Sequence, residues 1–277
     1  MRHDTPHDPA DLARLAETAA RTVAPALVKG FRSDMDISFK RDAHDVVTAY
    51  DREAERVISE VLQAGAPGSQ ILGEETGSSG EARLRWIIDP IDGTANFARG
   101  LAYWCISIAA EVDGDVVAGV VLDPMAEHLF VAADGEATLD GTPMRSASAA
   151  DDRSTLLTSF PNQHDVDLLG DAAFALLAQI TSTYQHHHST GSGALNLVHV
   201  AAGWSDATMG FDTGPWDVAA GAHILRRAGG RYAGFREGVV VDHPQQSLDY
   251  VAAGAGGDHA ALIARVRELS SSRLPAA

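Results

Sequence analysis

The first third of the chain places apolar residues at helical spacing. After Asp8-Pro9, the segment ADLARLAETAARTVAPALVKGF predicts a helix that Asp8 caps and that Pro25 kinks. The segment DVVTAYDREAERVISEVLQAG predicts a second helix over residues 45–65, with Ile58, Val61 and Leu62 on one face. Short strands are expected at SQILGEE and at LRWIIDP, which follow this helix.

Between residues 103 and 139 the pattern changes to β-rich runs that are separated by turn residues, which is typical of hairpins. From residue 155 onward, strand-like and helix-like segments alternate. The strands are expected at TLLTSF, STYQHHHS, SDATMGF, RYAGF and YVAAG, and the helices at DVDLLGDAAFALLAQI, SGALNLVHVAAG, WDVAAGAHILRRAGG and DHAALIARVRELS. The small polar stretch RSASAADDRS predicts a boundary between two halves, 1–145 and 146–277, in a layered α/β or α+β architecture.

Composition narrows the classes of partner. The 277 residues include 38 acidic residues against 21 Lys and Arg, a formal charge of −17, and no basic run offsets it. Such a surface repels nucleic acid and anionic lipid, so we expect neither a nucleic acid nor a membrane as partner. The single Cys105 gives no disulfide framework. The N-terminal segment lacks a signal-peptide core, and no apolar run approaches the roughly 20 residues that span a bilayer, so a cytoplasmic protein is expected.

The stretch WIIDPIDGTANF, residues 86–97, carries the strongest chemical signal. An aliphatic strand leads into Asp89, and a turn through Pro90-Ile91 can bring Asp92 beside it. Carboxylates held together disfavour ionisation unless a cation offsets them, and all-oxygen sites suit Mg²⁺. The backbone amides of Gly93 and Thr94 offer donors for a phosphate. This combination indicates metal-assisted phosphoryl hydrolysis.

Together with three other segments, this stretch resembles the inositol monophosphatase family, which belongs to the Mg²⁺-dependent, lithium-sensitive sugar-phosphatase superfamily. GEET at 73–76, WIIDPIDGTANF at 86–97 and WDVAAG at 216–221 match its three signatures in order, and DVVTAYDREAE at 45–55 and GVVLDP at 119–124 match further segments. The resemblance implies the layered αβαβα sugar-phosphatase fold of the inositol monophosphatase/fructose-1,6-bisphosphatase type, dependence on two or three Mg²⁺ ions, and a homodimer.

The resemblance also implies roles for individual residues. One cation would be held by Glu74, Asp89 and the carbonyl of Ile91, and a second by Asp89, Asp92 and Asp217, with Glu74 contributing through water to a third. Thr94, with Asp51 behind it, would orient and deprotonate the attacking water, and Glu75 is a further catalytic candidate behind the ligands. The amides of Gly93 and Thr94 would hold phosphate oxygens. The loop of Gly191, Ser192, Gly193 and Ala194 would line the leaving-group pocket.

The chain departs from the family where that pocket is expected. Gly210 stands seven residues before Asp217, at the position of the glutamate that contacts inositol hydroxyls in relatives, and Asp212 is the nearby acid that could reach the same space. Lys40 lies where the family has a basic residue near the site, although a solvated surface lysine is the alternative interpretation. His186, His187 and His188 replace a segment that usually carries an arginine. Consecutive residues of a strand face alternate sides, which disfavours a metal site there.

We therefore expect a Mg²⁺-dependent phosphatase that acts on a small phosphate monoester, either inositol-phosphate-like or another sugar, polyol or metabolite phosphate. Loss of a charged acceptor for ring hydroxyls predicts weaker selectivity for inositol 1-phosphate. The alternatives are histidinol phosphate, fructose 1,6-bisphosphate and 3′-phosphoadenosine 5′-phosphate. A non-catalytic regulatory binding protein is the competing class, as known for some bacterial relatives.

Overall fold

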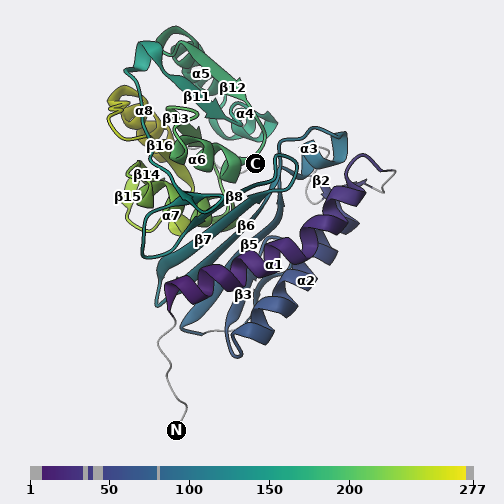
Figure 1. Ribbon diagram of the computed structural model, residues 1–277. Coiled ribbons are helices and arrows are strands. Elements are labelled where there is room, and N and C mark those ends of the chain that lie inside the picture. Colours follow the sequence, from purple (N-terminus) through teal and green to yellow (C-terminus); the bar gives the residue numbers. More distant parts are fainter. Residues whose placement is uncertain (1–7, 34–36, 40–45, 80–81, 273–277) are drawn as a thin grey trace.

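The computed structural model describes residues 8–33, 37–39, 46–79 and 82–272. Its strands form an eight-stranded sheet, a six-stranded sheet and a two-stranded ribbon (Figure 1). The eight-stranded sheet has the order β10-β9-β8-β7-β6-β5-β3-β4, the six-stranded sheet β12-β11-β13-β16-β14-β15, and the ribbon pairs β1 with β2. The strands are β1 (Ile37–Phe39), β2 (Val46–Thr48), β3 (Gln70–Gly73), β4 (Gly77–Ser79), β5 (Leu84–Asp92), β6 (Cys105–Val112), β7 (Asp115–Asp123), β8 (His128–Ala132), β9 (Thr138–Leu139), β10 (Thr142–Pro143), β11 (Thr155–Thr158), β12 (His186–Ser189), β13 (Ala207–Gly210), β14 (Arg231–Arg236), β15 (Val239–Val241) and β16 (Asp249–Ala253).

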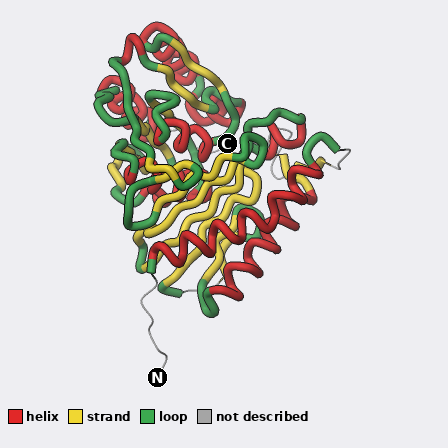
Figure 2. Tube along the Cα trace, viewed as in Figure 1, coloured by secondary structure: helices red, strands yellow, loops and turns green. Residues whose placement is uncertain are grey.

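Helices cover both sheets and separate them, as the trace in Figure 2 shows. The helices are α1 (Pro9–Gly30), α2 (Ala49–Gly65), α3 (Thr94–Arg99), α4 (Gln163–Leu169), α5 (Asp171–Thr183), α6 (Gly193–Ala201), α7 (Pro215–Arg227) and α8 (Ala260–Ser271), with short 3₁₀ turns η1 (Asp151–Arg153) and η2 (Pro244–Gln246). α1 and α2 pack on one face of the eight-stranded sheet, and α6 and α7 pack between the two sheets. α5 and α8 cover the outer face of the six-stranded sheet. This order of layers is the predicted αβαβα arrangement, which is confirmed.

Strand β5 lies inside the eight-stranded sheet, and all of its residues except Arg85 are buried. Trp86 and Ile88 pack into the core beneath α1 and α2, whereas Ile87 faces the core shared with α6 and α7. Side chains of a strand alternate between its faces, so a strand buried on both sides reads as a continuous hydrophobic run. The strand therefore carries the acids at its end into the interior between the layers.

The helix at the chain's start is confirmed, including its cap. The Asp8 carboxylate accepts a hydrogen bond from the Ala10 amide at 2.9 Å, and Pro9 occupies the first turn. The helix continues through Pro25 to Gly30.

The second helix begins later than predicted. Residues 46–48 form strand β2, and Thr48 caps α2 in a reciprocal box with Asp51. β-branched residues favour strands, and a threonine followed three residues later by an acid is a helix-start signal, so the expectation of a helix from residue 45 was wrong.

The helix predicted over residues 165–180 is two helices. α4 ends at Leu169 and α5 starts at Asp171, with Gly170 between them at φ +57° and ψ −138°. Only glycine reaches this region of backbone space without strain, so the chain turns there instead of continuing. The edge strand β15 was not predicted.

The eight-stranded sheet is formed by chain segments that end at Pro143, and the six-stranded sheet by segments that begin at Thr155. One core of apolar side chains lies between these sheets and takes residues from both, such as Ile87 and Tyr250. Because the interior is shared, the sheets do not by themselves define independent domains, and the division at residues 145 and 146 stays a prediction.

Candidate active site

An irregularity in β5 brings two acids to one place. Asp89 pairs with Ser107 of β6 and Asp92 pairs with Cys105, so three residues of β5 correspond to two of β6. In a regular strand, residues three apart face opposite sides, and one extra residue removes that alternation. The extra residue lies at Pro90-Ile91, where proline lacks the amide that a regular ladder needs. Both residues are buried, because only 2% of the surface of Asp89 and 6% of the surface of Asp92 are exposed.

A third carboxylate reaches this place from the second half of the chain. Asp217 lies in the first turn of α7, where its Oδ2 accepts a hydrogen bond from the Gly214 amide at 2.6 Å. One carboxylate oxygen from each of Asp89, Asp92 and Asp217 lies within 4.8 Å of the other two. The sequence separated these residues by more than a hundred positions, and the layered fold joins them.

Asp89 lies in the interior among other carboxylates. The pKa of the Asp89 carboxyl lies well above its ordinary range. Burial is the largest cause, followed by the neighbouring carboxylates of Glu74, Asp92 and Asp217. Hard divalent cations such as Mg²⁺ prefer oxygen ligands and offset such repulsion, so this donor set could hold one or more of them. Glu74 thus lies close enough to act on Asp89, although the compact triad consists of the three aspartates.

Asp92 is oriented by the beginning of α6. Its carboxylate accepts hydrogen bonds from the Ala194 amide at 2.7 Å, the Gly193 amide at 3.3 Å and the Ser192 hydroxyl. Burial raises the pKa of Asp92, and these hydrogen bonds partly oppose that effect. These three donors, from Ser192, Gly193 and Ala194, therefore bind a carboxylate of the cluster. The sequence did not reveal this contact.

Thr94 and Asp51 form a buried pair beside the cluster. The Thr94 hydroxyl lies 2.9 Å from Asp51 Oδ1 and 3.0 Å from the carbonyl oxygen of Ile91. The other oxygen, Asp51 Oδ2, accepts the Thr48 amide at 2.8 Å and the Thr48 hydroxyl at 2.6 Å. Burial raises the pKa of Asp51, and its hydrogen bonds partly oppose that effect. The structure thus places the two residues next to each other, as the resemblance to the family implies.

Gly93 makes the turn that follows the acids. Its φ of +99° lies in the left-handed region, and a Cβ added there would lie 3.0 Å from the carbonyl of Tyr103 and 3.2 Å from that of Gly191. Glycine is the residue that meets both requirements. The same turn therefore brings the loop after β12 against the start of α3, where Asn96 donates to the Thr190 carbonyl at 2.8 Å.

Glu55 is a structural residue that sequence reasoning missed. It is 1% exposed, and its carboxylate accepts the amides of Glu75 and Thr76 at 2.9 and 3.0 Å and the Thr76 hydroxyl at 2.6 Å. It thereby fixes the loop that carries Glu74 and Glu75. The signal was present in the sequence, because Asp51, Glu55, Ile58 and Leu62 share one helical face and an acid on a buried stripe requires partners.

The predicted leaving-group residues lie in three segments. Gly191, Ser192 and Gly193 lead into α6, and the Gly191 amide donates a hydrogen bond to the Ser159 hydroxyl at 3.2 Å. Asp212 forms a 2.6 Å contact with His164 Nε2, and its amide donates to Asp249 at 3.1 Å. His164 was not singled out in the sequence because its partner lies 48 residues away. Lys40 lies outside the described residues.

The space beside Gly210 is filled. A Cβ added at this position would lie 2.9 Å from Tyr250 Cε1 and 3.1 Å from Thr213 Cγ2. Tyr250 is 1% exposed and stacks on Tyr232 with ring centroids 5.1 Å apart. A longer side chain at 210 would therefore displace a packed aromatic pair.

The three consecutive histidines lie in the edge strand β12, with His186 and His188 exposed and His187 half-buried between them.

With this geometry established, comparison with known proteins decides the family. The model of the inositol monophosphatase family matches residues 8–271. The chain belongs to this family. Nus factor SuhB of Escherichia coli strain K12 is 32% identical over 265 residues, which cover 94% of this chain and 97% of the relative. Nus factor SuhB of Pasteurella multocida is 35% identical over 230 residues, which cover 81% and 85% of the two chains.

Solved structures agree with this assignment. Mycobacterium tuberculosis SuhB is 32% identical and superposes with a TM-score of 0.76, covering 96% of this chain and 99% of that one. Thermotoga maritima IMPase is 29% identical with a TM-score of 0.80, covering 94% and 98%. Within the part of the chain that the structure describes, no helix has both the length and the apolar character to cross a membrane.

Proposed function

We propose that this protein is a Mg²⁺-dependent phosphatase that hydrolyses a small-molecule phosphate monoester. The observation that carries the proposal is the triad of Asp89, Asp92 and Asp217, in which the two strand residues are buried and Asp217 is half-buried, and in which one carboxylate oxygen of each lies within 4.8 Å of the others. Asp89, Asp92, Asp217, Glu74 and the carbonyl of Ile91 would hold the cations, which would supply Lewis-acid stabilisation of the phosphoryl oxygens and lower the pKa of water. Family membership and the donor chemistry support this assignment.

The remaining residues of the site supply positioning and proton transfer. The Thr94 hydroxyl donates to Asp51 and keeps lone pairs with which it accepts a hydrogen bond from the attacking water. As the water oxygen bonds to phosphorus, its proton moves to Thr94 Oγ1 and the threonine proton moves to Asp51 Oδ1. The P–O bond to the alcohol breaks at the same time, and the leaving alkoxide takes a proton from water. Thr48 donates to Asp51 Oδ2 and so holds the carboxylate in place. The amides of Gly93 and Thr94 bind phosphate oxygens. Glu75, which follows the metal ligand Glu74, is a further catalytic candidate that does not itself hold a cation.

The substrate is proposed from the departure at Gly210. Tyr250 and Thr213 fill the space beside Gly210, so position 210 offers no carboxylate that could accept hydrogen bonds from the hydroxyls of inositol. A missing charged acceptor lowers the discrimination between polyols. The preferred substrate is therefore a sugar, polyol or metabolite phosphate other than inositol 1-phosphate, and the candidates include histidinol phosphate, fructose 1,6-bisphosphate and 3′-phosphoadenosine 5′-phosphate.

A substrate panel tests this proposal. The rates of phosphate release from inositol 1-phosphate, the three candidates and glycerol 2-phosphate are measured with Mg²⁺ and with EDTA. We expect Mg²⁺-dependent hydrolysis, with inositol 1-phosphate among the poorer substrates. A large preference for inositol 1-phosphate would refute the interpretation of Gly210, and absence of turnover on all substrates would refute the phosphatase.

A regulatory binding protein is the second candidate, because several relatives carry the name Nus factor SuhB. Because of that name, the comparisons do not support the expectation that the protein has no nucleic-acid partner. The two candidates differ in what the acidic cluster does. Hydrolysis requires Asp89, whereas a binding surface elsewhere on the protein does not, so the Asp89→Asn variant separates them. The homodimer stays a prediction, which light scattering in solution tests.

A further inference from the structure

Two buried acids of α2 reach two different parts of the candidate site. Asp51 accepts a hydrogen bond from the Thr94 hydroxyl, and Glu55 binds the turn of residues 74–76, which joins β3 to β4. Side chains four residues apart in a helix point the same way, so one helix face holds both parts. The carboxylate of Glu75 contributes to the raised pKa of Asp51, which places the turn against this face of α2.

The β3–β4 turn is anchored on two sides. On the side of the sheet, the Glu74 amide donates to the carbonyl of Ile88 in β5 at 3.2 Å. On the side of α2, Glu55 Oε2 accepts the Glu75 amide at 2.9 Å. Glu55 Oε1 accepts both the amide of Thr76 at 3.0 Å and its hydroxyl at 2.6 Å. The backbone that carries the Glu74 side chain is therefore held between β5 and α2.

Gly73 allows Glu55 to approach the turn this closely. A Cβ added at Gly73 would lie 2.3 Å from Glu55 Cδ and no more than 2.5 Å from either carboxylate oxygen. Glu55 is 1% exposed, so water hardly competes for its oxygens. Hydrogen bonds to an ionised acceptor are stronger than those between neutral groups, so this contact holds the turn firmly.

We propose that Glu55 is a positioning residue that sets the affinity of the site for Mg²⁺ by holding Glu74 beside Asp89. This role rests on the proposed function, in which Glu74 would be a ligand of a cation. Among the neighbouring carboxylates, Glu74 has the largest effect on the pKa of Asp89, so a displaced turn would change the donor set. Residues that orient metal ligands typically alter affinity or activity about 10- to 100-fold when they are replaced.

The affinity for Mg²⁺ tests this role. The protein is freed of metal with EDTA, dialysed and titrated with Mg²⁺ in a calorimeter. Glu55→Gln keeps the size of the side chain, but an NH₂ group replaces one acceptor oxygen and faces an N–H donor of the turn. The Kd for Mg²⁺ should therefore rise about tenfold or more. Thr76→Val removes one hydrogen bond and should raise Kd by a smaller factor, whereas Thr76→Ser keeps the hydroxyl and should retain the wild-type Kd.

Asp206 provides the matched control for stability. Its carboxylate accepts the amides of Ala149 and Thr155 at 2.6 and 2.7 Å, as Glu55 accepts the amides of its turn. It lies immediately before β13, in the six-stranded sheet of the second half of the chain. Asp206→Asn should lower Tm, as Glu55→Gln does, and leave the Kd for Mg²⁺ unchanged.

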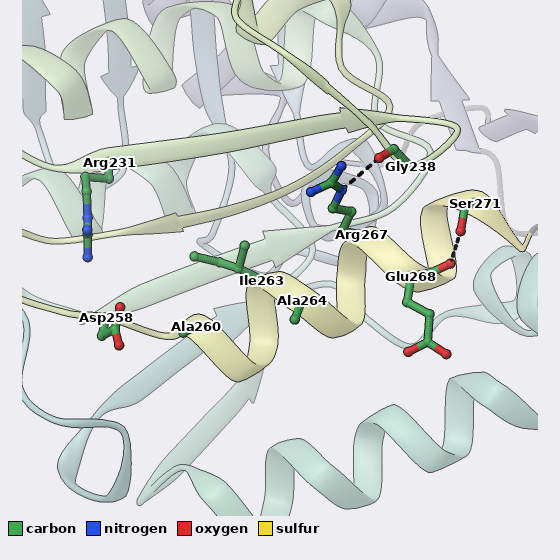
Figure 3. A pocket seen from close by; sticks show the side chains of 9 residues that line it. All are labelled: Arg231, Gly238, Asp258, Ala260, Ile263, Ala264, Arg267, Glu268 and Ser271. Carbon is green, nitrogen blue, oxygen red and sulfur yellow. Dashed lines mark hydrogen bonds between the residues drawn. The ribbon is translucent and has the colours of Figure 1, made fainter.

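Glu268 provides the control for charge. Figure 3 shows it on α8, at the hollow between this helix and the β14–β15 hairpin, and its carboxylate pairs with Arg265 at 2.8 Å. Glu268→Gln removes one negative charge, as Glu55→Gln does, and should leave the Kd for Mg²⁺ unchanged.

The possible results separate the role of Glu55 from the proposed function. If the wild type binds Mg²⁺ and Glu55→Gln binds it equally well, the role of Glu55 is overturned and the proposed function stands. An equal rise of Kd in Asp206→Asn would also overturn it, because affinity would then follow stability. Absence of Mg²⁺ binding by the wild type would refute the metal site and this role together. If Glu55→Gln does not fold, equal Kd values for Thr76→Val and Thr76→Ser would overturn the role.

Discussion

The carboxylate cluster and the contact between His164 and Asp212, which we call the rim, are built differently. Asp89 and Asp92 are almost fully buried and lie on a central strand, whereas the side chains of His164 and Asp212 are 44% and 28% exposed and belong to loops and a helix start. Buried acids are held by many neighbours, and exposed pairs contribute little to stability. Under the proposed function, the interior would set the type of reaction and the rim would contribute to the choice of substrate.

The largest effect is expected at the centre of the cluster. Asp89→Asn removes a shared ligand, and loss of several kcal/mol of transition-state stabilisation should lower kcat by at least about a thousandfold. The exposed acid Asp134 provides the matched control, and Asp134→Asn should retain wild-type kcat. Steady-state phosphate release checks both variants. Equal kcat for Asp89→Asn and the wild type would remove Asp89 from the mechanism.

The same variant should be more stable than the wild type when metal is absent. Burial and neighbouring carboxylates raise the pKa of Asp89, so the folded protein holds this proton more tightly than the unfolded chain. The stability that this group contributes is complete below its ordinary pKa and is lost as pH rises through the raised value. In EDTA at pH 7, Asp89→Asn avoids that loss and should have the higher Tm. A lower Tm would show that the cluster does not strain the metal-free fold.

The next effect is expected at the buried pair beside the cluster. Thr94→Val keeps the shape but removes the hydroxyl that joins water to Asp51, and loss of general-base assistance should lower kcat about 10²- to 10³-fold. Thr94→Ser retains the hydroxyl and should recover most of the activity. Comparison of the two variants by steady-state kinetics isolates the hydroxyl. A Thr94→Val enzyme with normal kcat would leave Asp51 without a catalytic role.

At the rim, smaller changes are expected. Asp212→Asn removes the charge that faces His164 and should change KM by about three- to tenfold while kcat stays near the wild-type value, since it acts on one exposed contact. The measurement is the kcat and KM for the best substrate of the panel. A fall in kcat as large as that of Thr94→Val would show that Asp212 takes part in the chemical step, as the buried residues do. The two regions would then not differ in function.

The smallest expected effect concerns the packing beside the rim. Gly210→Ala places a methyl group 2.9 Å from Tyr250 and should destabilise the protein by about 1–2 kcal/mol through overpacking. Gly135→Ala is the matched control, because a Cβ there meets no atom within 4 Å. Denaturant unfolding measures both. If Gly210→Ala were as stable as the control, the space beside Gly210 would be open to a longer side chain and to the substrate.

Most elements could be predicted because each carries its own periodicity, whereas the αβαβα order of the layers was implied by the resemblance to the family. The errors arose where two local signals competed. Thr48 reads as part of a helical segment, but its hydroxyl and β-branched neighbours favour a strand that ends in a cap. Gly170 reads as an ordinary helical position, but its backbone lies in a region that other residues avoid. The edge strand β15 is short, and its pairing with β14 is a tertiary property.

Asp89 and Asp92 could be named from the sequence because they fall within one short motif, which also contains Gly93 and Thr94. What the sequence could not give was the set of partners that arrive from elsewhere. Glu55 reaches the loop after β3 across 20 residues, and His164 reaches Asp212 across 48. Such contacts depend on how the layers are stacked. The helical pattern marks Glu55 as an acid on a buried face, but it does not name the partners.

The dependence of phosphate release on Mg²⁺ tests the central claim most directly. The wild-type protein is freed of metal with EDTA and then titrated with Mg²⁺ while hydrolysis of its best substrate is followed. Because Asp89, Asp92 and Asp217 would hold the cations, we predict negligible turnover in EDTA and a saturable rise on adding Mg²⁺. Turnover that is the same in EDTA as in Mg²⁺ would contradict the account.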